Sequence, residues 1–192
     1  LAEEKRLAKI AEDKRQAKLA EEKRLAKIAE DKRQAKLAEE KRLAKIVEEQ
    51  RLLADQGDAS AQAYLGGEYF LGESVPQDYA KALKWYRLAA DQGYANAQFL
   101  LGAMYQDGRG VPQDDVEAVK WYRLAADQGN ANAQFNLGRM YHSGRGVPQD
   151  HAEAVKWYRL AADQGYANAQ FYLGSMYQDG RGVPQDDVEA VK

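Results

Sequence analysis

Cysteine is absent from this 192-residue sequence, and proline occurs only four times. The absence of cysteine excludes disulfides, thiolate metal sites and cysteine nucleophiles. No run approaches the roughly 20 apolar residues that a helix needs to cross a bilayer, and no basic-then-apolar signal segment opens the chain. We therefore expect a soluble protein of the cytoplasm or the periplasm, since both compartments tolerate a chain without cysteine. The sequence starts at Leu1 and not at methionine, so we expect it to be part of a longer protein.

The charged residues divide the chain into a basic arm and an acidic body. Residues 1–46 contain 15 Lys and Arg and 10 Asp and Glu, a net charge of +5. The other residues contain 13 basic and 20 acidic side chains, a net charge of −7. The arm mixes bases with acids and has no aromatic residue that could stack on nucleobases, and charges interrupt its apolar face. We therefore expect it to bind neither nucleic acid nor a membrane.

The arm is built from an 18-residue repeat. Residues 1–18, LAEEKRLAKIAEDKRQAK, recur unchanged at 19–36, and residues 37–46 begin a third copy. The repeat has no Gly or Pro and consists mostly of strong helix formers. Eighteen residues make five helical turns, which favours a nearly straight helix over a left-handed supercoil.

The apolar positions of the arm leave two arrangements open. They cover about half of the helix circumference and are interrupted by charges. Acid-to-base pairs at i,i+4, which would stabilise an isolated helix, are missing, and weaker i,i+3 pairs such as Glu3–Arg6 remain. The arm therefore packs against another helix, in an antiparallel pair, or stands alone as a charged stalk.

The rest of the chain repeats every 36 residues. All three tryptophans and all four prolines keep this spacing: Trp85, Trp121, Trp157, Pro76, Pro112, Pro148 and Pro184. A fixed period of this length is the signature of a solenoid of stacked units. We therefore predict two segments, an arm at 1–46 and a solenoid at 47–192. The solenoid consists of a half repeat at 47–57, repeats at 58–93, 94–129 and 130–165, and a truncated repeat at 166–192.

Each unit predicts two helices joined by a turn. In residues 94–129 the first helix runs from about Asn96 to Gln106, and its core face carries Ala97, Leu101 and Met104. Gly102 lies inside this helix, where glycine costs helical stability. We therefore expect the backbone of a neighbouring helix to approach it closely.

The connector and the second helix have signals of their own. Gly108 and Gly110 provide a turn with positive φ, and Gly129 ends the second helix. Asp114 caps its start, and Glu117 completes a capping-box pattern. The same pairs recur as Asp150/Glu153 and Asp186/Glu189.

The junction between the arm and the body keeps the repeat register. Residues 47–57, VEEQRLLADQG, match residues 119–129, VKWYRLAADQG, which form a second helix. We therefore expect one continuous helix from Leu1 to about Asp55. At the other end Lys192 corresponds to Lys120, so we expect the last second helix to be a stump.

Three motifs recur in order over about residues 58–192: A-x-A-Q-x-x-L-G-x-M-Y, G-x-G-V-P-Q-D and A-V-K-W-Y-R-L-A-A-D-Q-G. They resemble the Sel1-like repeat family, a relative of the tetratricopeptide repeat. The resemblance implies an all-α fold, a right-handed α-solenoid of helix–turn–helix repeats, here fused to one long N-terminal helix. It also implies first helices that line a concave surface, and adaptor roles, mostly in bacteria. Some cysteine-rich members are linked to β-lactam binding or hydrolysis, which this cysteine-free chain does not inherit.

No group of residues predicts catalysis, a metal site or a cofactor. His142 and His151 occur in one repeat only, and we expect both to be surface residues. The pair Asp114–Asp115 is explained in part by the helix cap, and the turn has too few oxygen ligands for calcium. The G-R-G turn lacks the strand and the Lys-Ser/Thr of a phosphate loop.

Differences among the repeats suggest where a partner binds. Three columns vary on the first helices, three residues apart and opposite the core face: 64/100/136/172, 67/103/139/175 and 70/106/142/178. We predict a protein-binding strip formed by Tyr64, Phe70, Leu100, Gln106, Asn136, Arg139, His142 and Tyr172. Tyrosine and arginine are enriched in interface hot spots. Neutral drift on an exposed face is the alternative explanation.

The sequence thus favours a non-enzymatic scaffold or adaptor that binds a protein or peptide in the solenoid groove. The alternative is a structural stalk, in which the long helix drives self-association or sets a spacing. In either case we expect the chain to form a homo-oligomer through the N-terminal helix or the open ends of the solenoid.

Overall fold

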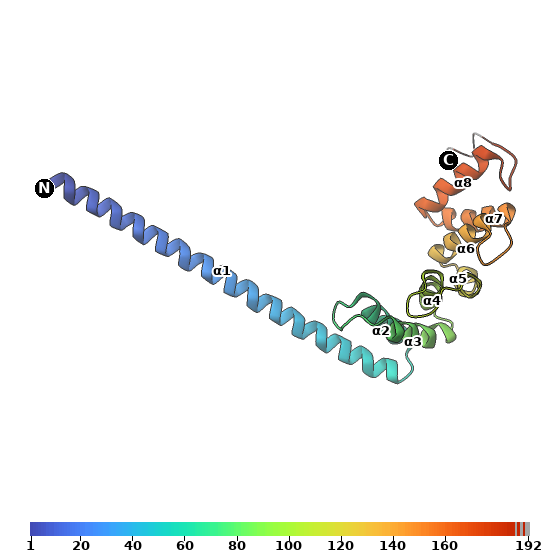
Figure 1. Cartoon of the computed structure of the whole chain (residues 1–192), viewed down its shortest axis with the longest axis horizontal. Coiled ribbons are helices and arrows are strands. Elements are labelled where there is room, and N and C mark those ends of the chain that lie inside the picture. Colours follow the sequence, from blue (N-terminus) through green and yellow to red (C-terminus); the bar gives the residue numbers. More distant parts are fainter. Residues whose placement is uncertain (187, 189, 191–192) are drawn as a thin grey trace. The chain divides into compact units, whose positions relative to one another are not determined.

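In the computed structural model of this chain, residues 1–186, 188 and 190 are described, and they form eight α-helices and no strand (Figure 1). The helices are α1 (Ala2–Asp55), α2 (Ala59–Leu71), α3 (Tyr79–Asp91), α4 (Ala95–Asp107), α5 (Asp115–Asp127), α6 (Ala131–Ser143), α7 (His151–Asp163) and α8 (Ala167–Asp179). The contacts divide the chain into two units, Leu1–Ile46 and Val47–Lys192, which are described separately. Within the described residues, no helix combines the length and the apolar character that crossing a membrane requires.

The first unit is a single exposed helix. Helix α1 is continuous to Asp55, which confirms the predicted long N-terminal helix. Glu21–Arg24 is an i,i+3 ion pair with an N–O distance of 3.8 Å, and Gln16 donates a hydrogen bond of 2.7 Å to Glu12. Exposed pairs of this kind contribute only about 0.2–0.5 kcal/mol each. The helix-forming composition of the arm is therefore its main source of local helical stability.

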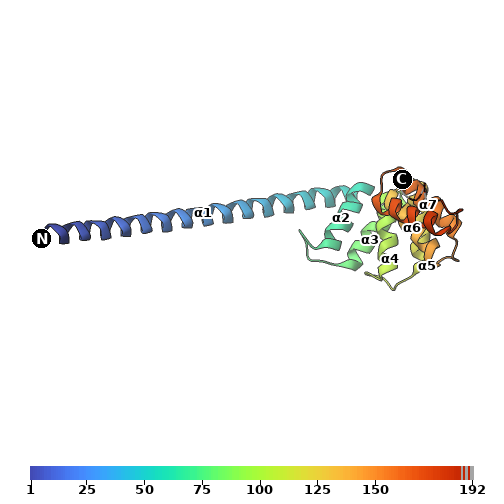
Figure 2. The same ribbon diagram turned by 90° about the horizontal axis from the view of Figure 1, so that it is seen from above.

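The second unit is a stack of helix pairs. Each helix from α2 to α7 packs against the next one along the chain, so the pairs form an α-solenoid, as predicted (Figure 2). Ala97, Leu101 and Met104 of α4 are at most 1% exposed and pack on Tyr86 of α3. The predicted core face of the first helix is therefore confirmed.

Each turn between the two helices of a pair is fixed by glycine and aspartate. Gly108 and Gly110 have φ of 68° and 72°, as predicted. Asp114 accepts a hydrogen bond of 3.0 Å from the backbone N–H of Glu117 and so caps α5. The reciprocal half of the capping box is wrong, because the N–H of Asp114 donates to Tyr105 O instead. Glu189, in the last predicted pair, lies outside the described residues.

The glycine inside each of the first helices α2, α4 and α6 makes room for a tyrosine ring. A Cβ on Gly102 would lie 2.8 Å from the ring of Tyr122 and 3.2 Å from the carbonyl oxygen of Ala118. The predicted close approach is real, but its main cause is a side chain and not a helix backbone. Tyr122 is 1% exposed, so the glycine lets a large aromatic side chain into the core.

Buried glutamines join successive pairs. Gln98 of α4 donates a hydrogen bond of 3.1 Å to the carbonyl of Ala90, and Gln128 donates one of 2.7 Å to Gln98. Gln62 donates in the same way, at 3.1 Å, to the carbonyl of Ala54. The C-terminal end of α1 therefore makes the contact that a second helix makes in the later repeats.

Candidate protein-binding site

A hollow of about 280 Å³ lies on the first helices of three successive repeats. We call it the α6 hollow, because α6 supplies half of its lining. Its lining residues come from α4, α6, α7, α8 and the turn after α6: Gln106, Arg139, Met140, His142, Ser143, Arg145, Tyr158 and Tyr172. Four of the eight predicted binding residues are among them, namely Gln106, Arg139, His142 and Tyr172.

Tyr158 of α7 lines the hollow with a hydroxyl that has no hydrogen-bond partner among the described residues. Its side chain is 0% exposed, and burial, more than the neighbouring Tyr172, raises the pKa of its hydroxyl. The equivalent Tyr122 in the previous repeat donates a hydrogen bond of 2.6 Å to Gln106. His142 occupies the position of Gln106 in this repeat, and it makes no such bond with Tyr158.

Arg139 is the exposed cation of the hollow. Its guanidinium lies 5.9 Å from the ring centroid of Phe135, and Nη1 donates a long hydrogen bond of 3.4 Å to Asn136. The nearby Arg145 is bound to both carboxylate oxygens of Asp115 at 2.8 and 3.1 Å. In the part of the chain that is described, no carboxylate forms an ion pair with Arg139. Its charge therefore remains available for a partner.

His142 and His151 face each other at the side of the hollow. Their ring centroids are 5.1 Å apart, and Nδ1 of each ring is buried without a partner among the described atoms. Burial, followed by the charges of His151 and Arg181, lowers the pKa of His142. Both histidines are half-buried, because the rings of α6 and α7 contact each other at a tilt of 50°. The neutral form of His142 is therefore favoured over the charged form.

Tyr172 of α8 forms an aromatic wall of the hollow. Its ring centroid lies 5.6 Å from Phe135 and 5.5 Å from Tyr158. The Tyr172 side chain is 36% exposed although both neighbours are buried. Aromatic pairs at such distances stabilise one another. The wall is therefore held in place while one face remains open to a partner.

The other four predicted residues lie outside the hollow. Asn136 is adjacent to it, because its side-chain oxygen accepts the bond from Arg139. Tyr64 packs on the buried cluster at the start of the solenoid, and Leu100 packs on the cluster around Tyr86. Both side chains are half-buried. They are therefore less accessible than we expected from their position opposite the core face.

Phe70 is covered by its own repeat and the next one. Its ring lies 5.3 Å from that of Tyr79, edge to face, and the guanidinium of Arg109 lies 5.3 Å from its ring centroid. Gln77 also donates a hydrogen bond of 2.9 Å to the carbonyl of Phe70. These contacts give Phe70 a role in holding the turn between α2 and α3.

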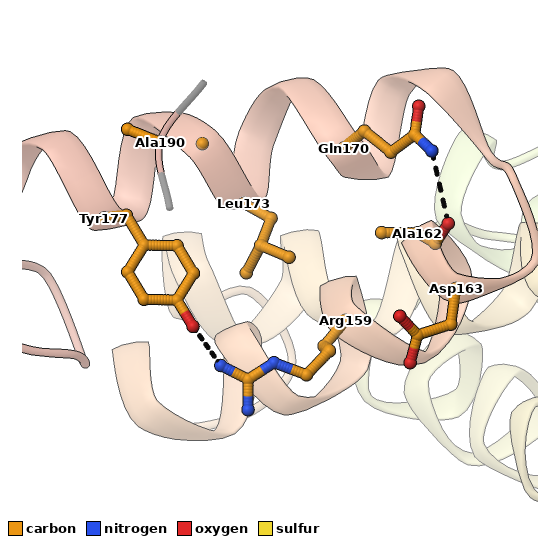
Figure 3. A pocket seen from close by; sticks show the side chains of 8 residues that line it. Arg159, Ala162, Asp163, Gln170, Leu173, Tyr177 and Ala190 are labelled. Atoms are coloured by element: carbon orange, nitrogen blue, oxygen red, sulfur yellow. Dashed lines mark hydrogen bonds between the residues drawn. The ribbon is translucent and has the colours of Figure 1, made fainter. Parts of the chain in front are cut away.

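A second hollow, of about 350 Å³, lies beside α7 and α8 (Figure 3). Arg159 donates to the hydroxyl of Tyr177, and Gln170 donates a hydrogen bond of 3.3 Å to the carbonyl of Ala162. The inner repeats make the same bonds, and there Arg87 also lies 5.6 Å from the ring of Trp121 in the following repeat. In the inner repeats a tryptophan of the following repeat therefore packs at the position that corresponds to this hollow.

Tyr158 was not among the predicted residues of the strip, because this position is tyrosine in all three complete repeats. Variation marks changing positions, and the missing partner becomes visible only when Tyr158 is compared with Tyr122. Ser143 and Arg145 were also missed. Among the described residues, no group of three or more His, Asp or Glu side chains could hold a metal ion.

Stacked helix–turn–helix units, joined by buried glutamines and by tyrosines packed on glycines, define an α-solenoid repeat protein. The chain belongs to the Sel1 repeat family, whose model matches residues 59–94, 95–130, 131–166 and 167–192. Repeat proteins of this class typically mediate protein binding. A search of the curated proteins finds no match.

Solved bacterial structures share this fold. A protective antigen of uropathogenic Escherichia coli with an SLR fold is 48% identical, with a TM-score of 0.74 over 75% of this chain and 31% of that one. A Sel1 repeat protein from Oxalobacter formigenes is 37% identical, with a TM-score of 0.68 over 72% of this chain and 55% of that one. This chain thus spans about a third and about half of their lengths. A putative Sel1 repeat protein from Klebsiella pneumoniae, 23% identical with a TM-score of 0.51 over 74% of this chain and 71% of that one, shares the fold alone.

Proposed function

We propose that this chain is a non-enzymatic scaffold or adaptor that binds a protein partner on its first helices. The observation that carries the proposal is the α6 hollow, to which three successive first helices, α4, α6 and α8, contribute side chains. A partner that lies across these helices would contact several repeats at once. The exposed Arg139 and Tyr172 are of the residue types that dominate binding energy in interfaces.

Variation among the repeats supports the same surface. At the position of Arg139 the other two complete repeats carry the small residues Gly67 and Ala103. At the position of His142 they carry Phe70 and Gln106. The core residues below them are at most 1% exposed: Leu137 is leucine in every repeat, and Met140 matches Met104 and Met176. The change at Arg139 therefore alters the exposed surface of this repeat, and the change at His142 also removes the hydrogen bond that the previous repeat makes to its buried tyrosine.

Peptide-display selection against the 192-residue chain tests the proposal. We expect selected peptides to bind with at least about tenfold lower affinity to Arg139→Ala and to Tyr172→Ala, since hot-spot truncations typically cost about 2 kcal/mol or more. Arg33→Ala in the arm removes the same charge elsewhere and should leave the affinity unchanged. Failure to select any peptide, or equal affinity for all these variants, would contradict the proposal.

The alternative function, a self-associating stalk, also rests on a specific observation. The arm exposes apolar side chains at regular intervals, with Leu7 at 62% and Leu25 at 56% exposure. Packing against a second helix would remove these side chains from water, which is favourable for apolar surface. The two functions are compatible, because the arm and the α6 hollow belong to different units.

A further inference from the structure

We propose that the α6 hollow recognises a carboxylate group of the protein partner, held by the guanidinium of Arg139 and the hydroxyl of Tyr158. This inference rests on the proposed function in one respect: the carboxylate belongs to a peptide or protein partner. The binding of the carboxylate itself depends only on the hollow.

The first argument is the unsatisfied hydroxyl of Tyr158. A buried hydroxyl without a partner costs about 1–3 kcal/mol relative to a bonded one. The same hydroxyl of Tyr122 is bonded to Gln106 at 2.6 Å, so the fold can supply a partner at this position. In the α6 hollow the chain supplies none among its described residues, and an acceptor oxygen from a ligand would satisfy Tyr158.

The second argument is the charge of the hollow. Arg139 has no described ion-pair partner, and its hydrogen bond to Asn136, at 3.4 Å, is long enough to be exchanged for a better acceptor. Arginine binds carboxylates through two parallel hydrogen bonds, which are stronger than bonds between neutral groups. Arg139 and Tyr158 both donate, so their common ligand is an acceptor, and a carboxylate supplies two acceptor oxygens.

The third argument favours a singly charged ligand over a phosphate. The other arginine of the hollow, Arg145, is already neutralised by Asp115 at 2.8 Å. A phosphate with two negative charges would face only one unpaired guanidinium, that of Arg139. One guanidinium and one neutral hydroxyl match the single charge of a carboxylate. The volume of about 280 Å³ lies just below the ~300–1,000 Å³ range of small-molecule pockets, which suits one residue of a peptide.

An NMR titration of the full chain with three small probes tests this inference. The probes are N-acetyl-glutamate α-amide, which has a side-chain carboxylate, N-acetylglycine, which has a terminal carboxylate, and the neutral N-acetyl-glutamine α-amide. We expect at least one carboxylate to shift the signals of Arg139 and Tyr158, with an affinity at least about fivefold above that of the neutral amide. The carboxylate that binds more tightly identifies the source. Equal binding of the neutral amide, or no binding of either carboxylate, would overturn the inference.

Variants assign the roles of the two residues. Arg139→Gln should abolish the preference for a carboxylate, and Tyr158→Phe should weaken binding while the fold is retained, since its hydroxyl has no partner to lose. Arg33→Gln in the arm is the charge-matched control and should bind like the unchanged chain. Unchanged affinity in Tyr158→Phe would overturn the role of the hydroxyl. If selected peptides bind the first helices but no carboxylate probe binds, the inference fails and the proposed function stands.

Discussion

Tyr122 donates a hydrogen bond of 2.6 Å to the side-chain oxygen of Gln106. One repeat later Tyr158 occupies the same position in the core, but His142 has replaced the glutamine and the bond is missing. Two tyrosines in equivalent packing therefore differ in one hydrogen bond. The hydroxyl of Tyr122 therefore contributes to the stability of its repeat, whereas the hydroxyl of Tyr158 is left without a partner among the described residues.

The two tyrosines respond differently when their hydroxyls are removed. Tyr122→Phe should lower the free energy of unfolding by about 1 kcal/mol, because it removes a hydrogen bond and leaves Gln106 without its donor. Tyr158→Phe should leave the free energy of unfolding unchanged or raise it, because it removes a buried group without a partner. Urea unfolding followed by circular dichroism measures both. Equal losses in the two variants would show that Tyr158 is bonded in solution.

Adjacent glycines in α2 provide a test of packing. A Cβ on Gly66 would lie 2.5 Å from the ring of Tyr86, so Gly66→Ala should destabilise the solenoid by about 1–3 kcal/mol. A Cβ on Gly67 would lie 3.6 Å from the hydroxyl of Tyr86, an ordinary contact. Gly67→Ala should therefore be neutral or stabilise by about 0.5–1 kcal/mol, since alanine favours the helix. Thermal unfolding of both variants makes the comparison, and equal effects would contradict it.

His142 makes stability depend on pH. Burial lowers its pKa from the ordinary value of 6.5, with smaller effects from His151 and Arg181. The unfolded chain therefore binds a proton more readily than the folded chain, and stability falls as the pH drops from about 6.5 toward the folded pKa. His142→Gln should flatten this dependence and give Tyr158 an acceptor, as Gln106 does for Tyr122. Urea unfolding at pH 7.5, 6.5 and 5.5 measures it; an equal slope for both proteins would exclude His142 as the cause.

Self-association through the arm depends on its apolar positions. Ile10 and Ile28 are 18 residues apart and 41% and 40% exposed, so they occupy equivalent positions of the arm repeat. Replacing both with lysine should shift an oligomer toward the monomer, because charges would have to be buried between helices. Replacing Gln16 and Gln34 with lysine adds the same charge at the hydrogen-bonded positions and should have a smaller effect. Light scattering that shows a monomer for the unchanged chain would contradict self-association.

The sequence predicted the fold because period and composition determine it. The spacing of Trp85, Trp121 and Trp157 identified the repeat unit, and the absence of Gly and Pro in residues 1–46 identified the long helix. The positive φ of Gly108 and Gly110 followed from the turn chemistry alone. These features are local or periodic, so they can be read without knowledge of distant contacts.

The candidate site could be predicted only in part, because contacts between repeats decide it. Variation among the repeats pointed to Arg139 and His142, and both line the α6 hollow. It could not show that Phe70 is covered by Arg109, since this contact joins two repeats. It also could not reveal Tyr158, whose identity never changes and whose missing partner is a matter of geometry.

The most direct test of the account is to map where a selected peptide binds. NMR chemical-shift changes in the full chain should be largest on the first helices, at Gln106, Arg139 and Tyr172, when the peptide is added. The second helices provide the comparison, because Leu124 of α5 and Leu160 of α7 are 47% and 46% exposed. Shifts concentrated around these leucines, with the α6 hollow unaffected, would contradict the account.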